Sequence, residues 1–152
     1  MANHEQRLEA LLEQEAELSF SAFTNEMAWE IGNILVDAAR EQGKAITMDI
    51  TRGEQQLFHY AFAGTSPDND RWIERKNRVV YRFHHSSYYY YWYLEHEGQS
   101  LEDRLRVSRF EYAPVGGAFP IIVKGVGVVG AITVSGLKHD EDHLFVVDAL
   151  KR

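Results

Sequence analysis

The sequence predicts an α+β fold in which helices cover an antiparallel sheet. Segments whose polarity alternates residue by residue, as in strands, occur as neighbouring pairs toward both ends of the chain. Segments with helical periodicity surround and separate these pairs. Neighbouring strands pair antiparallel, whereas a doubly wound parallel sheet needs strict alternation of strand and helix. No linker interrupts the chain of 152 residues, so we expect a single domain over residues 1–152.

The first part of the chain predicts two helices. Residues 7–17 carry leucines at helical spacing, and a short extended segment follows at 18–22, where apolar residues alternate with serines. Thr24 is a typical N-cap residue, and Gly43 is typical of a helix C-terminus. A second, longer helix is therefore expected between them.

A β-hairpin and a long helix come next. Residues 45–52 and 55–63 alternate in polarity on either side of a compact turn at Gly53. Ser66 and Pro67 form a strong helix start, because serine caps a helix and proline fits its first position. This helix is expected to continue through residue 83.

The remaining elements are two helices, a second pair of strands and a C-terminal helix that should bury Leu144, Val147 and Leu150. The break at Gly116-Gly117 separates the helices from the strands. In order, the predicted elements are helix 87–96, a short helix capped by Ser100, strands 119–124 and 128–135, and helix 140–150.

Composition excludes several classes of function. The chain has no cysteine, which excludes disulfides, thiolate metal sites and a cysteine nucleophile. Its formal net charge of −7 repels nucleic acid and anionic lipid, so neither is an expected partner. No apolar stretch is long enough for a membrane span, and the N-terminus does not resemble a signal peptide. The expected location is therefore the cytoplasm.

The segment from Gly125 to Gly130 matches the dinucleotide-binding pattern Gly-x-Gly-x-x-Gly. That pattern requires a helix to start within it, whereas the following residues 131–134 favour a strand. We interpret the glycines as a tight hairpin in which the backbone passes close to a neighbouring strand.

Two histidines, His139 and His143, are spaced to share one face of a helix, as in half of a zinc site. No third ligand is evident nearby in the sequence, and acidic residues in a first helical turn also complement the helix dipole. We therefore predict no metal site. The sequence does not decide whether the chain is an enzyme. If it is one, Asp142 and His143 are the natural general-base pair, although adjacent helical residues point about 100° apart.

Four arginines form a stripe on the helix that begins at Ser66. They are Arg71, Arg75, Arg78 and Arg82. Such a stripe can clamp a carboxylate or a phosphate through bidentate guanidinium contacts. The alternative is a solvated face that pairs with acidic neighbours.

Residues 88–93 are five tyrosines and one tryptophan. A helix of this sequence is aromatic on every face, so one face must leave the core of a monomer. Because Tyr and Trp are enriched in protein interfaces, we expect a contact between copies of the chain. The alternative is a stacking wall for a flat ligand such as haem, with His84 or His85 as the iron ligand.

Several longer motifs resemble those of a known family. They are residues 64–73, Arg75-Lys76, His85-Ser86-Ser87, residues 116–121, residues 127–137 and Asp142-His143. Together they resemble the signature of an uncharacterised bacterial and fungal protein family. That family is similar, in its C-terminal half, to the haem-degrading, GlcG-like domain superfamily.

The resemblance implies a profilin-like fold, with a five-stranded antiparallel sheet flanked by helices on both faces. It also implies assembly as a homo-oligomer and glycines that shape turns around a surface cleft. Some relatives in the superfamily bind haem or act beside cobalamin chemistry, so haem is the cofactor that the resemblance suggests.

Two main hypotheses follow. The first is an oligomeric small-molecule-binding protein that holds an anionic ligand, with haem as the specific version, in a cleft at the ends of its elements. The expected ligand-binding residues are Ser66, Asn69, Arg71, Arg75, His85, Gly116, Gly117, Ser135 and His143. The second is an assembly or chaperone-associated adaptor without ligand chemistry.

Overall fold

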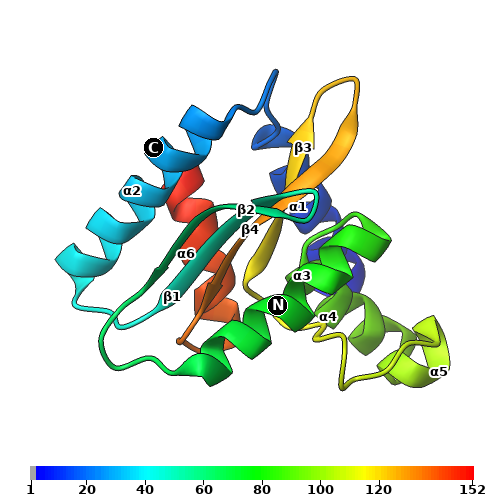
Figure 1. The fold of residues 1–152 in the computed structure, drawn as a ribbon. Helices are drawn as coiled ribbons and strands as arrows, with labels where there is room; N and C mark the ends of the chain where they lie inside the picture. The colour runs from blue at the N-terminus through cyan, green and yellow to red at the C-terminus, as the bar shows by residue number, and fades with distance from the viewer. Residues whose placement is uncertain (1–2) are drawn as a thin grey trace.

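The computed structural model describes residues 3–152 as six helices and four strands in one chain (Figure 1). The helices are α1 (His4–Glu17), α2 (Asn25–Gln42), α3 (Pro67–Phe83), α4 (Ser87–Glu97), α5 (Leu101–Leu105) and α6 (His139–Leu150). The strands are β1 (Thr47–Arg52), β2 (Gln55–Ala61), β3 (Ala118–Val123) and β4 (Gly127–Ser135). The α+β class and the order of elements are as the sequence predicts.

The strands form one antiparallel sheet in the order β2-β1-β4-β3. Each outer pair is a hairpin, and the two hairpins join through β1 and β4, from Thr47 opposite Ser135 to Arg52 opposite Gly130. The glycine-rich segment makes the β3–β4 turn, which confirms the hairpin interpretation. A Cβ at Gly130 would lie 2.0 Å from the carbonyl oxygen of Thr51, so the backbones pass as closely as expected there.

The sheet has four strands, and the prediction of five was wrong. The extended segment predicted at residues 18–22 does lie beside β3, where the Phe20 amide donates to Ile122 O and Phe20 O accepts from the Lys124 amide, both at 2.8 Å. It makes only this one bridge with Val123, because α1 ends at Glu17 and α2 begins at Asn25. Within the described residues, the outer edge of β3 is thus paired with the chain only at Phe20, and no fifth strand runs along it.

Helices cover both faces of the sheet, but the side chains buried on one face are apolar and many of those on the other are polar. Helices α2 and α6 lie on one face, where an apolar core forms, and α3 crosses the other face (Figure 1). The apolar core includes Leu35, Met48, Ile50, Phe119, Ile132, Val134 and Val146. Toward α3 the alternation presents the buried side chains Thr47, Asp49, Thr133 and Ser135 instead.

Hydrogen bonds hold α3 to this polar face. Asn77 of α3 accepts from the Thr133 hydroxyl and donates to Asp49 at 3.4 Å. Asp49 also accepts from Gln56 at 2.7 Å and from Nδ1 of His59 at 3.0 Å. Polar groups buried without partners are costly, so this network fixes how α3 lies on the sheet.

Helices α1 and α4 pack together beyond the β3 edge, and α5 follows α4 (Figure 1). All six aromatic residues at 88–93 are half-buried there. One detail of the C-terminal helix differs from the prediction. Val147 is buried and Leu150 is half-buried, but Leu144 is 51% exposed, in an open hollow that Ala38 and Gln42 of α2 also line.

Candidate functional site

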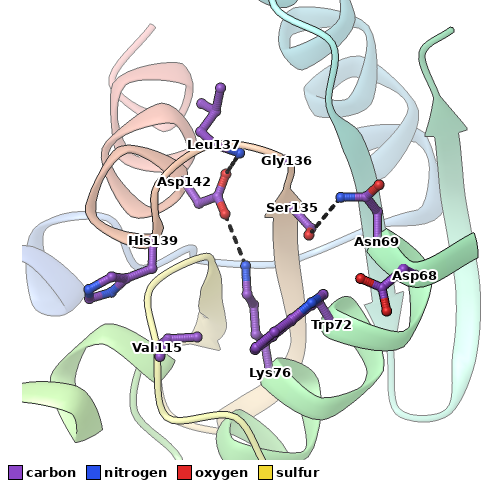
Figure 2. Close-up of a pocket in the computed structure, with 10 residues that line it drawn as sticks. All are labelled: Asp68, Asn69, Trp72, Lys76, Val115, Ser135, Gly136, Leu137, His139 and Asp142. Atoms are coloured by element: carbon purple, nitrogen blue, oxygen red, sulfur yellow. Dashed lines mark hydrogen bonds and ion pairs between the residues drawn. The ribbon is translucent and has the colours of Figure 1, made fainter. Parts of the chain in front are cut away.

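A cleft of about 340 Å³ opens where the N-terminal ends of α3 and α6 meet the end of β4 (Figure 2). Helix dipoles place partial positive charge at both of these helix ends. The lining residues are Asp68, Asn69, Trp72, Lys76, Val115, Ser135, Gly136, Leu137, His139 and Asp142. The cleft therefore combines convergent polar groups with an apolar wall, as small-molecule sites do.

The start of α3 forms one side of the cleft. Ser66 is the N-cap of this helix, and its amide donates to Oδ1 of Asn69 at 3.0 Å. The Asn69 side chain in turn donates to the Ser135 hydroxyl at 3.3 Å. The predicted residues Ser66, Asn69 and Ser135 are thus linked, and the Ser135 proton is left free to donate.

Lys76 and Asp142 form a buried ion pair at the floor of the cleft (Figure 2). Each side chain is 3% exposed, and Nζ lies 3.0 Å from Oδ2 of Asp142 and 3.0 Å from the carbonyl oxygen of Val134. Oδ1 of Asp142 accepts from the Leu137 amide at 3.0 Å. Burial lowers the pKa of Lys76, and burial raises the pKa of Asp142 to about 6 against the opposing effect of Lys76.

The two predicted glycines contact residues that line the cleft, Gly117 at Lys76 and Gly116 at His139. Gly117 has a φ of +139°, and a Cβ there would lie 2.6 Å from Nζ of Lys76, so only glycine leaves room for the lysine. The Gly116 amide donates to Nδ1 of His139 at 3.0 Å. A ring nitrogen that accepts a hydrogen bond carries no proton, so the neutral His139 ring carries its proton on Nε2. Burial lowers the pKa of His139, which favours this neutral form.

His143 lies near the cleft but does not line it. Its ring is stacked on Tyr88, with centroids 4.6 Å apart, and Nε2 donates to Oε1 of Gln14 at 2.7 Å. Nδ1 is buried and finds no hydrogen-bond partner within residues 3–152. Burial lowers the pKa of His143 to about 4. Asp142 and His143 contact different partners, Lys76 and Leu137 for the first and Gln14 for the second.

The arginines of the predicted clamp serve another purpose. Arg71 pairs with Glu74 at 3.3 Å on the exposed face of α3. Arg75 lies 4.4 Å from the centroid of the Trp72 ring and donates to the carbonyl oxygen of Arg109. Further along, Arg78 and Arg82 donate to Glu111 O and the Tyr112 hydroxyl. Arg75, Arg78 and Arg82 thus hold the loop at 109–112 against α3, and none of the four arginines lines the cleft.

His85 lies at the opposite end of α3 from the cleft. The helix has 17 residues, which is about 25 Å. Nδ1 of His85 donates to Oε1 of Glu15 at 2.8 Å, and Glu15 also accepts from the Ser86 amide at 3.0 Å. His84 is the exposed C-cap of α3 in the left-handed conformation, with a φ of 65°. One ligand of ordinary size cannot touch both the cleft and His85.

The structure therefore brings together Ser66, Asn69, Gly116, Gly117 and Ser135, and it separates Arg71, Arg75, His85 and His143 from them. It adds Lys76, Asp142, His139 and Trp72, which the list of ligand-binding residues did not contain. No group of three or more His, Asp and Glu side chains within residues 3–152 is arranged to hold a metal ion. No helix in that range has the length and apolarity to cross a membrane.

Comparison with known proteins places this chain in a family. Residues 23–151 match the family described as haem degrading protein HbpS-like. A UPF0303 protein of Streptomyces coelicolor is 50% identical over 142 residues, which cover 93% of this chain and 90% of that protein. The crystal structure of the Ybr137w protein has a TM-score of 0.86 and 34% identity, over 94% of this chain and 84% of that one.

A more distant structure, the haem complex of PduOC, has a TM-score of 0.70 and 13% identity, over 86% of this chain and 94% of that one. At this identity the likeness concerns the fold alone. The extent of the sequence matches is decisive, and the chain belongs to the HbpS-like family and, within it, groups with the uncharacterised UPF0303 proteins.

Proposed function

We propose that the chain is a small-molecule-binding protein that holds an organic anion in the cleft between α3 and α6. The observation that carries the proposal is a set of hydrogen-bond donors with protons to spare. Lys76 has three ammonium protons, of which two point to Val134 O and Asp142. The Ser135 hydroxyl and Nε2 of His139 each add one donor.

The apolar wall suggests the rest of the ligand. Trp72 is 36% exposed, and Arg75 covers part of the ring while the indole also lines the cleft. Val115 and Leu137 lie across from it (Figure 2). A carboxylate at the floor with a small apolar body against Trp72 satisfies both halves of the cleft. Asp68 lies at the rim, so a ligand with a second anionic group would be repelled there.

Haem is a second candidate ligand, but the cleft does not fit it. An imidazole that binds iron through Nε2 carries its proton on Nδ1, whereas the Gly116 amide forces the opposite form on His139. His85 does fit an axial ligand, because Glu15 accepts its Nδ1 proton and leaves the Nε2 lone pair free. Haem, when bound, supplies ligand-exchange and redox chemistry at its iron, and this chain supplies the imidazole.

Titration of the purified protein with small carboxylates, followed by tryptophan fluorescence, tests the cleft. We expect Ser135→Ala to weaken binding about tenfold or more, because a hydrogen bond to a charged group is lost. The matched control, Ser21→Ala, changes an exposed serine outside the cleft and should bind normally. Equal affinities of both variants would overturn the proposal.

Haem titration followed by absorbance separates the two candidates. His85→Ala should abolish the haem spectrum without changing carboxylate binding, and Ser135→Ala should do the reverse. Haem uptake that survives His85→Ala would exclude His85 as the ligand.

Self-association through α4 is also part of the proposal. The six aromatic residues at 88–93 are half-buried in a single copy, which leaves apolar surface for a neighbour. We propose a homo-oligomer in the cytoplasm that binds neither nucleic acid nor membranes, in line with the net charge of −7.

A further inference from the structure

Lys76 is unlike the other four lysines of the chain. Lys44 is half-buried and Lys124, Lys138 and Lys151 are exposed, whereas the Lys76 side chain is 3% exposed and lines the cleft. Burying an ammonium is costly unless it is paired, and a purely structural pair is often replaceable by apolar residues. A lysine placed at the floor of a ligand cleft therefore calls for a chemical reason.

The surroundings of Lys76 make its ammonium proton easier to transfer than that of a solvated lysine. Asp142 lies 3.0 Å from Nζ and can take its proton. Burial lowers the pKa of Lys76 and raises the pKa of Asp142 to about 6, so both shifts favour transfer of the proton from the ammonium to the carboxylate. An uncharged lysine amine in a desolvated site is the nucleophile that forms imines with carbonyl compounds.

The structure also leaves space for a reacting carbon. Lys76 lines the cleft, so the reacting carbon can approach from that side, while the absence of a Cβ at Gly117, which would lie 2.6 Å from Nζ, lets the amine take up this position. Ser135 and His139 line the same cleft and offer donors to a carboxylate on the reacting molecule. Figure 2 shows Lys76 rising between Trp72 and Val115 toward Asp142, with Ser135 to one side and His139 to the other.

We propose that Lys76 forms a reversible imine with a 2-oxo acid bound in the cleft. The inference rests on the proposed function, because it requires the cleft to hold an organic anion. A 2-oxo acid has both groups that this site requires. Its carboxylate can accept hydrogen bonds from Ser135 and His139, and its ketone carbon can be attacked by the Lys76 amine.

The step balances within the site. Lys76 passes one proton to Asp142, and the amine nitrogen attacks the carbonyl carbon, so that a C–N bond forms and the carbonyl electron pair moves to oxygen. A proton shifts from nitrogen to that oxygen and gives the carbinolamine. Asp142 then protonates the hydroxyl, water leaves, and the nitrogen lone pair completes the C=N bond. The iminium keeps the positive charge beside an Asp142 carboxylate, as in the starting pair.

Reductive trapping tests the proposal on the unaltered protein. Wild-type protein is incubated with pyruvate and sodium cyanoborohydride, and the modified lysine is located by peptide mass spectrometry. We expect Lys76 to carry most of the adduct although it is the most buried lysine. An adduct confined to the surface lysines, in proportion to their exposure, would overturn the imine.

Lactate separates this result from the proposed function, because it has the carboxylate of pyruvate without the ketone. If both compounds change tryptophan fluorescence and compete, but Lys76 is not modified, the cleft binds anions and the imine is wrong. If neither binds and no adduct forms at Lys76, both proposals fail.

Two variants support the test. Asp142→Asn keeps an acceptor for the Leu137 amide but cannot take a proton, so we expect trapping at Lys76 to slow at least tenfold and to lose its dependence on pH near 6. Lys124→Gln removes an exposed lysine at the β3–β4 turn and should leave the Lys76 adduct unchanged. Trapping in Asp142→Asn at the wild-type rate and pH profile would contradict the role of Asp142.

Discussion

His143 is an ionisable side chain enclosed by the protein. The residue is 1% exposed, one ring nitrogen is hydrogen-bonded to Gln14, and the other has no partner within the described residues. Its pKa falls from 6.5 to about 4 on folding because burial penalises the cation. The unfolded chain therefore binds more protons than the folded chain between these two values.

This difference predicts that acid weakens the fold through His143. Stability that is present above pH 6.5 should be lost as the pH falls toward 4, by up to about 3 kcal/mol if the shift is realised in full. Asp142, whose pKa is raised to about 6, acts in the opposite direction over the lower part of this range. Urea unfolding at pH 7.5 and 5 measures the net change.

His143→Phe keeps a ring against Tyr88 and removes the titration, so its stability should fall less between the two pH values than that of the wild-type protein. His96→Ala, at a partly exposed histidine, should keep the wild-type difference. An unchanged difference in His143→Phe would show that another group titrates.

For individual residues of the cleft, the sequence identifies the polar and glycine residues better than the buried charged ones. Asn69, Ser135 and Gly117 follow from their places at the ends of elements, where clefts form. Lys76 does not, because in the sequence it stands beside Arg75 and looks like part of a solvated basic face. Its burial depends on how α3 is rotated on the sheet, which the Asn77 contacts fix and the periodicity alone does not.

Glu15 connects three elements. It is a buried carboxylate on α1 that accepts from the Ser86 amide and from His85, at the turn between α3 and α4. We expect Glu15→Ala to destabilise the fold by about 2–4 kcal/mol, since a buried amide and an imidazole lose their acceptor. Chemical denaturation measures this loss.

The control on the same helix is Glu13→Ala, which changes an exposed carboxylate and should cost less than about 0.5 kcal/mol. If the two variants lose similar stability, the Glu15 contacts carry no special weight and α1 is held by its apolar face alone.

Among the elements, the hairpins and helix caps follow from local chemistry, and the contacts between distant segments do not. Gly53 and the glycines at 125–130 predict both turns because few other residues fit them. The sequence could not show that Phe20 makes a single bridge and not a full strand. Alternating polarity indicates extended backbone, but it does not indicate how many backbone hydrogen bonds that segment makes to a neighbouring strand. The arginine stripe shows the same limit, because the acceptors of Arg75 and Arg78 lie in a loop more than thirty residues away.

For the molecule as a whole, the aromatic run predicts that charge on α4 will break the homo-oligomer that we propose. We expect the double variant Tyr91→Glu and Trp92→Glu to stay folded by circular dichroism and to sediment as a smaller species than the wild-type protein. Burying two carboxylates at an interface opposes association strongly. Analytical ultracentrifugation at several concentrations measures the change.

Trp29→Glu is the matched control, because Trp29 is 58% exposed on α2, away from α4, and should leave the assembly intact. Loss of assembly in Trp29→Glu alone would move the interface to α2. A wild-type protein that sediments as one copy would contradict the contact altogether.

The sheet also divides the protein by its tolerance of sequence change. On the α2 and α6 face, one aliphatic residue can replace another with little loss, because apolar packing has no required partner. On the α3 face, Asn77 is hydrogen-bonded to both Asp49 and Thr133. A single replacement among these three residues therefore leaves a buried polar group without a hydrogen-bond partner. Relatives should therefore differ by independent single substitutions on the α2 and α6 face and by coordinated pairs of substitutions on the α3 face. A selection for new ligands would then meet its strictest constraints on the side that holds the cleft.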